Sequence, residues 1–442
     1  MSSSAPLIYA ELLSNIRQVS VIVALCEPCD SATKVELSEN GKQFLLRHRG
    51  QLITLGLPSQ AISGFQLQKP ILGNKELSWR LPLAGQASRA SIEGAQSNEV
   101  PWSAKDLPSD AEFTCRRCRA IIIEKGTIKV WKDLPSENWA EMMDFWHCHK
   151  PDIPASEKEA DGSSSYRSYD AEKVAASKGY GASTRFLASS GIALIDITTF
   201  VLYPADCKNL TIMPASKSDS KSREATCARC QEYLGKLDNR AAGVRILKWQ
   251  LSGTSSKLPY SANSLEVSPR LSFYVSSLAI SAINSQCISR ILLMPSIANI
   301  AVDCSTGPPS SVVPRLNCHI TKPPADTPAS PSKFELCSKS SSMLLLWVLM
   351  SSVTYTSSIR NKSSSLASAT PTLAMKVFWR LVSTEEAAVL MDSDSVESIE
   401  LPTEGILEIE GDLRESALWL PSSARKFKEW DVGLLARYQP KP

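Results

Sequence analysis

The chain has 442 residues, of which 43% are hydrophobic and 21% charged. This composition is typical of a globular protein and excludes a collagen-like, a coiled-coil and a wholly disordered chain. Because 48 Lys and Arg side chains nearly balance 45 Asp and Glu, charge gives no argument for a dedicated nucleic-acid or membrane-surface binder. The length predicts two or three packed units at ~150 residues each.

The first part of the chain is predicted to form an antiparallel sheet. Short apolar runs alternate with turn residues, among them Asn40-Gly41, and the runs cover 19–26, 43–46, 51–57 and 61–67. Segment 1–112 is therefore predicted to be a β-rich lobe. No secretory leader is recognisable, and no apolar run approaches the ~20 residues that cross a bilayer. We therefore expect no membrane association, and we expect the twelve cysteines to be thiols or metal ligands in the cytoplasm and nucleus.

Further along, segment 113–151 holds a hairpin and a Trp-rich motif, and segment 152–184 lacks periodicity and is predicted to be a flexible linker. In segment 185–442, strands are predicted within 185–203 and at 244–251, 344–356, 374–382, 405–409 and 432–436. Helical spacing covers 264–293 and 422–429, and the Pro-rich stretch 307–340 is a predicted loop. The predicted class is β-rich α+β, with two β-dominated lobes and, between them, a zinc knuckle and a short amphipathic helix.

Three Cys-x-x-Cys pairs occur in the chain. Zinc binds tetrahedrally, and two thiolates from one tight turn supply half of its ligands. The pairs Cys115/Cys118 and Cys227/Cys230 both lie in contexts typical of hairpin tips, so together they predict one closed, structural zinc site. The alternative is that each pair consists of buried thiols, and this interpretation is favoured for Cys26/Cys29.

The Trp-rich motif predicts a short amphipathic helix. Its apolar side chains fall at i, i+3, i+4 and i+7, and they are Trp139, Met142, Met143 and Trp146. One interpretation is a helix packed on the sheet. The other is a partner-recognition surface, because Trp is enriched at binding hot spots and Met adapts to varied contacts.

The motif ends in His147, Cys148 and His149. Consecutive side chains point in different directions, so these three residues do not suit one closed metal site or a Cys–His dyad. A projecting Cys148 flanked by imidazoles can instead ligate a metal held by another protein. The other Cys–His neighbourhood, at Cys318, is interpreted as a loop or strand end.

These features together resemble one family. The chain resembles the HECT-like, E2-binding ubiquitin ligase family in five features. These are the run from Leu134 to Trp139, the Trp146–His149 segment, the two Cys-x-x-Cys pairs followed by Leu234-Gly235, and the stretches 344–348 and 418–425. The resemblance covers most of the chain. It implies a ubiquitin ligase-like protein that binds a ubiquitin-conjugating enzyme and promotes transfer of ubiquitin to substrates such as cyclin.

The resemblance also implies a second, non-catalytic role. In that role the chain binds the metallo-β-lactamase endonuclease of pre-mRNA 3′-end processing and places Cys148 at its zinc centre. One feature departs from a HECT ligase, which carries its acceptor cysteine near the C-terminus, because no cysteine follows Cys337 here. The candidate thiols for a ubiquitin thioester are Cys148 and Cys318. A ligase that only positions a charged conjugating enzyme needs neither.

Overall fold

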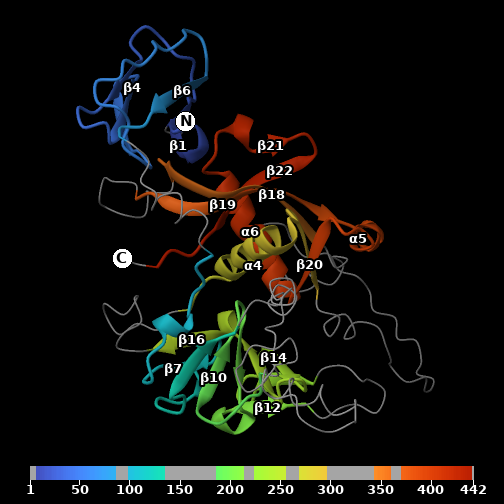
Figure 1. Ribbon diagram of the computed structural model, residues 1–442. Helices are drawn as coiled ribbons and strands as arrows, with labels where there is room; N and C mark the ends of the chain where they lie inside the picture. The colour runs from blue at the N-terminus through green and yellow to red at the C-terminus, as the bar shows by residue number, and fades with distance from the viewer. Residues whose placement is uncertain are drawn as a thin grey trace, which may run out of the picture. The chain divides into compact units, whose positions relative to one another are not determined.

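A computed structural model describes residues 6–85, 98–134, 186–213, 223–254, 268–295, 343–359 and 370–440. The chain divides into two compact units (Figure 1). Unit 1 comprises Met1–Gln96 with Ala282–Ala436, and unit 2 comprises Ser97–Ser281 with Arg437–Pro442. Unit 1 therefore combines an N-terminal segment with a segment from the last third of the chain, and unit 2 is formed mainly by the residues between them.

Unit 1 is built on a nine-stranded sheet with the order β21-β22-β19-β18-β1-β2-β6, in which β17 pairs with β18 and β20. Its strands are β1 (Leu7–Leu13), β2 (Gln18–Ala24), β6 (Glu76–Pro82), β17 (Arg290–Pro295), β18 (Met343–Ser357), β19 (Thr372–Val382), β20 (Val396–Leu401), β21 (Lys426–Phe427) and β22 (Trp430–Ala436). The antiparallel pairing of β1 with β18, with Tyr9 opposite Ser357, explains why segments so distant in sequence share one unit.

A second sheet of unit 1 consists of β3 (Lys34–Leu37), β4 (Gln43–His48) and β5 (Gln51–Gly56). Its apolar side chains, including Phe44 and Leu46, share a core with β1, β2 and β6. The predicted Asn40-Gly41 turn lies between β3 and β4. Gly41 has a φ of 66°, and a Cβ there would lie 2.1 Å from the Ala61 carbonyl oxygen, so this turn requires glycine.

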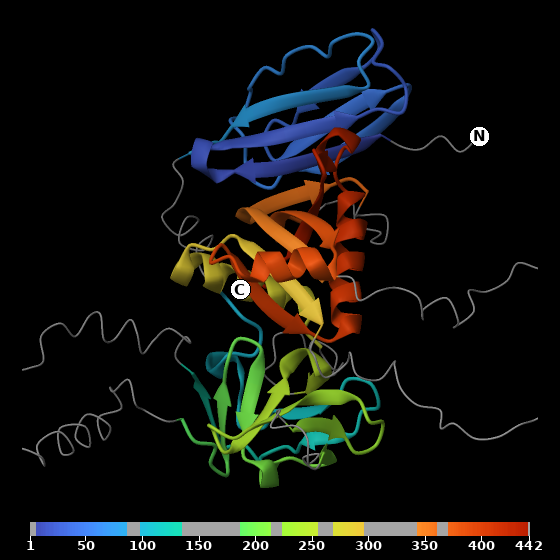
Figure 2. The same cartoon turned by 90° about the vertical axis from the view of Figure 1, so that its right-hand side faces the viewer.

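Helices α5 (Thr384–Met391) and α6 (Thr403–Ala417) belong to unit 1 (Figure 2). Ile406, Ile409 and Leu413 of α6 are buried, and Ser416 Oγ accepts a hydrogen bond from Leu434 N of β22 at 2.9 Å. The strand predicted over 405–409 is therefore wrong, because these apolar residues follow the helical period of the longer segment. Of the helix predicted over 422–429, only the 3₁₀ turn η9 (Ser422–Ala424) is helical, since β21 follows it.

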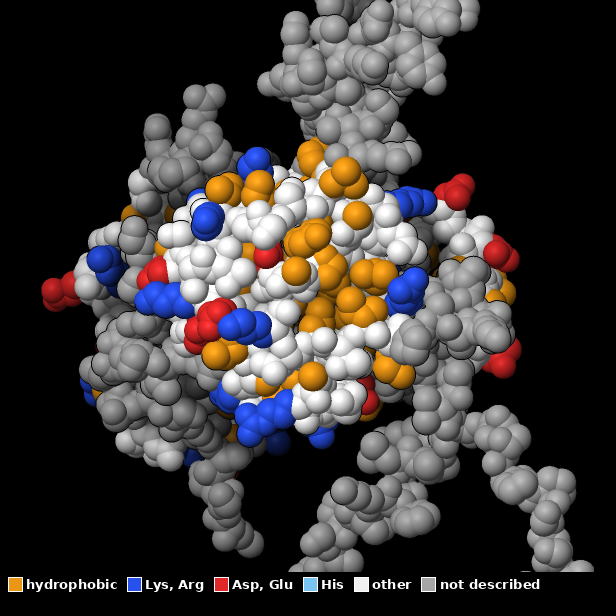
Figure 3. Space-filling view, turned by 90° about the horizontal axis from the view of Figure 1, so that it is seen from below, with side chains coloured by type: hydrophobic (Ala, Val, Ile, Leu, Met, Phe, Trp, Pro, Cys, Tyr) orange, Lys and Arg blue, Asp and Glu red, His pale blue; other side chains and the backbone are white. Residues whose placement is uncertain are grey.

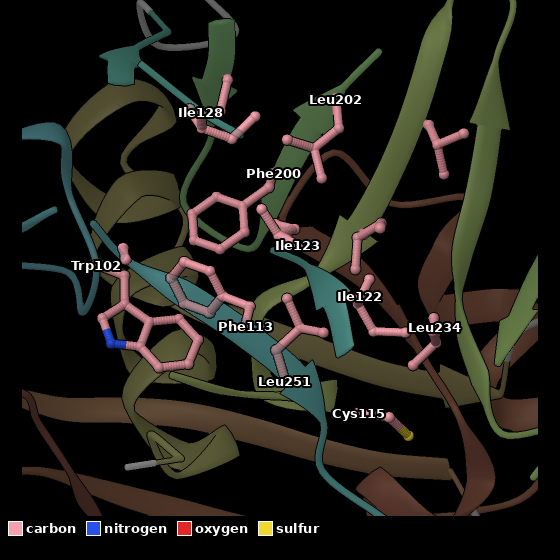
Figure 4. Packing of buried hydrophobic residues seen from close by; sticks show 14 of the residues in the cluster. Trp102, Phe113, Cys115, Ile122, Ile123, Ile128, Phe200, Leu202, Leu234 and Leu251 are labelled. Atoms are coloured by element: carbon pink, nitrogen blue, oxygen red, sulfur yellow. The ribbon is translucent and has the colours of Figure 1, made fainter. Parts of the chain in front are cut away.

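Unit 2 contains a seven-stranded sheet, ordered β12-β13-β14-β15-β11-β10-β9, and a three-stranded sheet, ordered β16-β7-β8. The strands are β7 (Glu112–Cys115), β8 (Ile121–Ile123), β9 (Val130–Asp133), β10 (Ile192–Ile195), β11 (Thr199–Leu202), β12 (Leu210–Ile212), β13 (Glu224–Cys227), β14 (Tyr233–Asp238), β15 (Gly243–Leu247) and β16 (Leu251–Thr254). Both sheets contribute to one core around Trp102, Phe113 and Phe200 (Figure 4).

Helix α4 (Leu271–Gln286) begins in unit 2 and ends in unit 1. The predicted helix over 264–293 is therefore only partly correct, because its last residues belong to β17. No helix among the described residues is long and apolar enough to cross a membrane.

The other face of the seven-stranded sheet carries a small apolar cluster of Leu194, Val201 and Ala241. Large apolar side chains of unit 2, among them Val130 and Leu187, are exposed. Seen from below, apolar side chains gather in one area, with Lys and Arg side chains around it (Figure 3).

The β-rich α+β class predicted from the sequence is confirmed. The Trp-rich motif, the linker 152–184 and the Pro-rich loop 307–340 lie outside the described residues.

Candidate metal centre

The first cysteine pair forms a tight turn between β7 and β8. The Cys115 amide donates a hydrogen bond to the Ala120 carbonyl at 2.8 Å, and the Arg119 amide donates one to the Cys115 carbonyl at 2.9 Å. Arg119 adopts a left-handed conformation with φ 63°. These bonds close the turn, and the Cys115 and Cys118 side chains are held on one hairpin tip.

The second pair repeats this geometry between β13 and β14. The Cys227 amide donates to the Glu232 carbonyl at 2.9 Å, and the Gln231 amide donates to the Cys227 carbonyl at 2.8 Å. Gln231, four residues after the first cysteine of its pair as Arg119 is in the first turn, has φ 62°. The two turns are therefore equivalent knuckles with the same hydrogen bonds and the same left-handed residue.

The two knuckles bring their four sulfurs together. Cys115 Sγ lies 3.7 Å from Cys230 Sγ, and Cys118 Sγ lies 3.5 Å from Cys227 Sγ. All four sulfurs lie within 4.8 Å of one another. A tetrahedral zinc with Zn–S bonds of about 2.3 Å places its sulfurs about 3.8 Å apart. The cluster therefore has the size and donor set of a closed four-thiolate metal site.

The surroundings of Cys115 and Cys118 shift the pKa values of their thiols in opposite directions. Burial raises the pKa of the Cys115 thiol to about 12. At Cys118 desolvation acts in the same direction, but the Ala120 amide and the neighbouring cysteine side chains outweigh it and lower its pKa to about 7. A cation bound among the sulfurs favours the thiolate form of each ligand, so metal binding releases protons.

Contacts around the cluster hold the knuckles in place. Arg117 of the first knuckle and Glu232 of the second form an ion pair at 2.8 Å. The Arg116 amide donates to the Gln250 carbonyl, and its guanidinium donates to the Trp249 carbonyl at 3.1 Å. These contacts bind the first knuckle to the second and to the segment that leads into β16.

The four cysteines predicted to form one site lie together in the structure, and their arrangement is compatible with a structural metal. Within the described ranges they are the one such group of His, Cys, Asp and Glu side chains. The third pair, predicted to be two buried thiols, differs in burial: Cys29 is buried in the core of unit 1, whereas Cys26 is exposed. The supporting residues Glu232 and Trp249 carried no recognisable signal in the sequence, because their role depends on strand pairing.

The other predicted site residues lie outside the described residues. These are Trp139, Met142, Met143, Trp146, His147, Cys148, His149 and Cys318. Their roles remain predictions.

Comparison with known proteins gives a family and two relatives. The family described as HECT-like ubiquitin-conjugating enzyme (E2)-binding matches residues 11–432. An uncharacterized protein of Saccharomyces cerevisiae, YJR141W, is 28% identical over 192 residues, which are 42% of this chain and 48% of that protein. An uncharacterized protein of Schizosaccharomyces pombe, C1734.10c, is 44% identical over 55 residues, or 12% of this chain and 16% of that protein. The chain thus spans about half or less of these relatives. No solved structure matches.

Proposed function

The chain belongs to the HECT-like ubiquitin-conjugating enzyme (E2)-binding family, and on that basis we propose that it binds a ubiquitin-conjugating enzyme. The observation that carries the proposal is the family match, which extends over 11–432 and so includes both units and both knuckles. The expected partners are the conjugating enzyme, ubiquitin and a cyclin-type substrate.

Zinc is the metal proposed for the four-cysteine cluster. Four thiolates at tetrahedral spacing are the ligand set that zinc takes in closed structural sites. Because such a site leaves no open coordination position, its role is to hold Cys115/Cys118 and Cys227/Cys230 together rather than to take part in ubiquitin transfer. Elemental analysis of the purified protein should give one zinc per chain, and its absence would contradict this assignment.

Ubiquitin transfer is proposed to proceed by positioning the charged conjugating enzyme. In this sequence no cysteine follows Cys337, and positioning requires no acceptor cysteine on this chain. The alternative is transthiolation, in which the thiolate of Cys148 or Cys318 attacks the thioester carbon of the charged conjugating enzyme. The conjugating enzyme then leaves as its free thiolate, and ubiquitin becomes bound to the chain by a new thioester.

The test combines a binding and a transfer assay with the full chain. Purified protein is incubated with a panel of conjugating enzymes, activating enzyme, ubiquitin, ATP and a cyclin. Capture of at least one conjugating enzyme and formation of ubiquitin chains without an adduct on this protein would support positioning. A reductant-sensitive adduct that is lost in Cys148→Ala or Cys318→Ala would support transthiolation. If no conjugating enzyme is bound, the proposal is refuted.

A second candidate function rests on the sequence of the Trp-rich motif. The apolar stripe from Trp139 to Trp146, followed by Cys148, favours insertion into a partner that holds a metal. By the resemblance stated above, that partner is the 3′-end-processing endonuclease, and this role requires a nuclear fraction of the protein. Pull-down with wild type, Trp146→Ala and Cys148→Ala, with melting curves for each, tests it. Unchanged binding by folded variants would refute this role.

A further inference from the structure

Lys248 is a buried amine in the core of unit 2. It begins the 3₁₀ helix η5 (Lys248–Gln250), and only 1% of its surface is exposed. Its Nζ donates a hydrogen bond to the Pro101 carbonyl at 3.3 Å and lies 5.4 Å from the centre of the Phe200 ring and 6.0 Å from that of Tyr274. A charged ammonium has three donors and is costly to bury without a paired carboxylate. The site therefore suits the neutral amine.

Among the described residues, charged groups lie near Lys248 but none forms an ion pair with it. Three carboxylates, those of Asp106, Asp133 and Asp196, attract a proton on the amine electrostatically. The aromatic ring of Tyr274 in α4 also faces the amine. The Tyr274 hydroxyl is itself buried and has no hydrogen-bond partner among the described residues. Burial outweighs the three carboxylates and lowers the pKa of the Lys248 amine to about 7.

The Pro101 carbonyl belongs to a short segment, Asn98–Leu107, that we name the strap. Asn98 donates a hydrogen bond to the Ser277 carbonyl of α4 at 3.0 Å, and the Ala104 amide donates to Asp133 of β9 at 2.9 Å. Between these anchors, Trp102 is buried against Phe113, with ring centres 4.9 Å apart (Figure 4). The strap therefore closes over the aromatic core of unit 2.

The strap is strained where it meets Lys248. Trp102, directly after Pro101, has φ 59°, a left-handed conformation that bulky residues adopt only when their surroundings impose it. The surroundings here are the aromatic core and the Lys248 contact. If the amine becomes charged, the cost of holding an ammonium away from water disfavours the closed site, and the strained backbone favours release of the strap.

We propose that Lys248 and the strap form a pH-sensitive latch, which is closed over the neutral amine and opens when the amine takes up a proton from water. Opening lets the ammonium reach solvent and uncovers the aromatic core at Trp102 and Phe113. The same movement reaches the metal centre, because η5 accepts the hydrogen bonds of Arg116 in the first knuckle. The latch does not depend on the proposed binding of a conjugating enzyme.

Hydrogen exchange of the metal-loaded 442-residue chain tests the latch. The strap peptide is followed by mass spectrometry between pH 7 and 9, with rates corrected for intrinsic exchange. Because the open state holds a solvated lysine and the closed state a neutral amine, the opening constant should fall roughly tenfold per pH unit. The opening constant of the strap peptide should also be larger than that of the β11 and β15 peptides, which report global unfolding.

Lys248→Met removes the titrating group and should leave strap opening independent of pH. The matched control is Lys236→Met, which removes an exposed lysine of β14 and should keep the wild-type slope. A wild-type strap whose opening does not change with pH would overturn the latch, as would a strap that opens only as often as β11. The wild-type series decides the question even if Lys248→Met fails to fold.

Discussion

The metal centre should dominate the stability of unit 2, because it joins two knuckles that are distant in sequence. Cys118 and Cys227 are 109 positions apart. In the chain-entropy treatment of cross-links, closing a loop of that length reduces the free energy of the folded state relative to the unfolded state by about 5 kcal/mol. Removing the metal should therefore lower the free energy of unfolding by about this amount.

The assay is urea denaturation of the protein with and without a strong chelator, followed by circular dichroism, with the metal content measured on the same samples. With denaturant slopes of about 1–3 kcal/mol per molar urea, the midpoint of unit 2 should fall by roughly 2 M or more. Cys227→Ser should produce the same shift without chelator. Cys26→Ser, which changes an exposed cysteine of unit 1, is the control and should leave the midpoint unchanged.

A protein that contains one metal per chain but keeps its midpoint in chelator, with the metal shown to be gone, would refute the reasoning. That result would mean that strand pairing alone holds the knuckles together. Equal shifts for Cys26→Ser and Cys227→Ser would also refute it, since they would show that the loss of any thiol has this effect.

Three further predictions concern stability. The pKa of Lys248 is about 7 when folded and 10.5 when unfolded, so the unfolded chain binds more protons between these values. Stability should therefore rise from pH 7 to 10.5, by at most about 5 kcal/mol, and Lys248→Met should remove the rise in denaturation midpoints. Phe200→Ala should cost about 3–5 kcal/mol in thermal unfolding, whereas Phe186→Ala at an exposed site should cost little. Gly235→Ala should lower the free energy of unfolding, because the added Cβ would lie 1.9 Å from the Arg245 carbonyl oxygen. Gly411→Ala in α6 has free space around the added Cβ and should raise the free energy of unfolding by up to about 1 kcal/mol, because alanine favours a helix over glycine. Urea titration measures both.

Local features of this protein followed from the sequence alone. Both knuckles were predictable because Cys-x-x-Cys fixes a tight turn within a few residues. The strands β18 and β19 were predictable because each contains a long apolar run. That the two knuckles bring their four cysteines together was also predictable from chemistry, since each supplies only half of a tetrahedral ligand set.

Tertiary structure decided what depends on distant partners. The pairing of β1 with β18 places strands more than 300 residues apart in one sheet. No local sequence pattern specifies which two strands become neighbours. The segment 405–409 looked like a strand because five residues do not separate a period of 2 from one of 3.6, and packing on β22 shows that it is helical. No sequence pattern marks Lys248 as buried. Its burial is decided by Pro101, Phe200 and Tyr274, which come from three separate parts of the chain and surround the amine only in the folded protein.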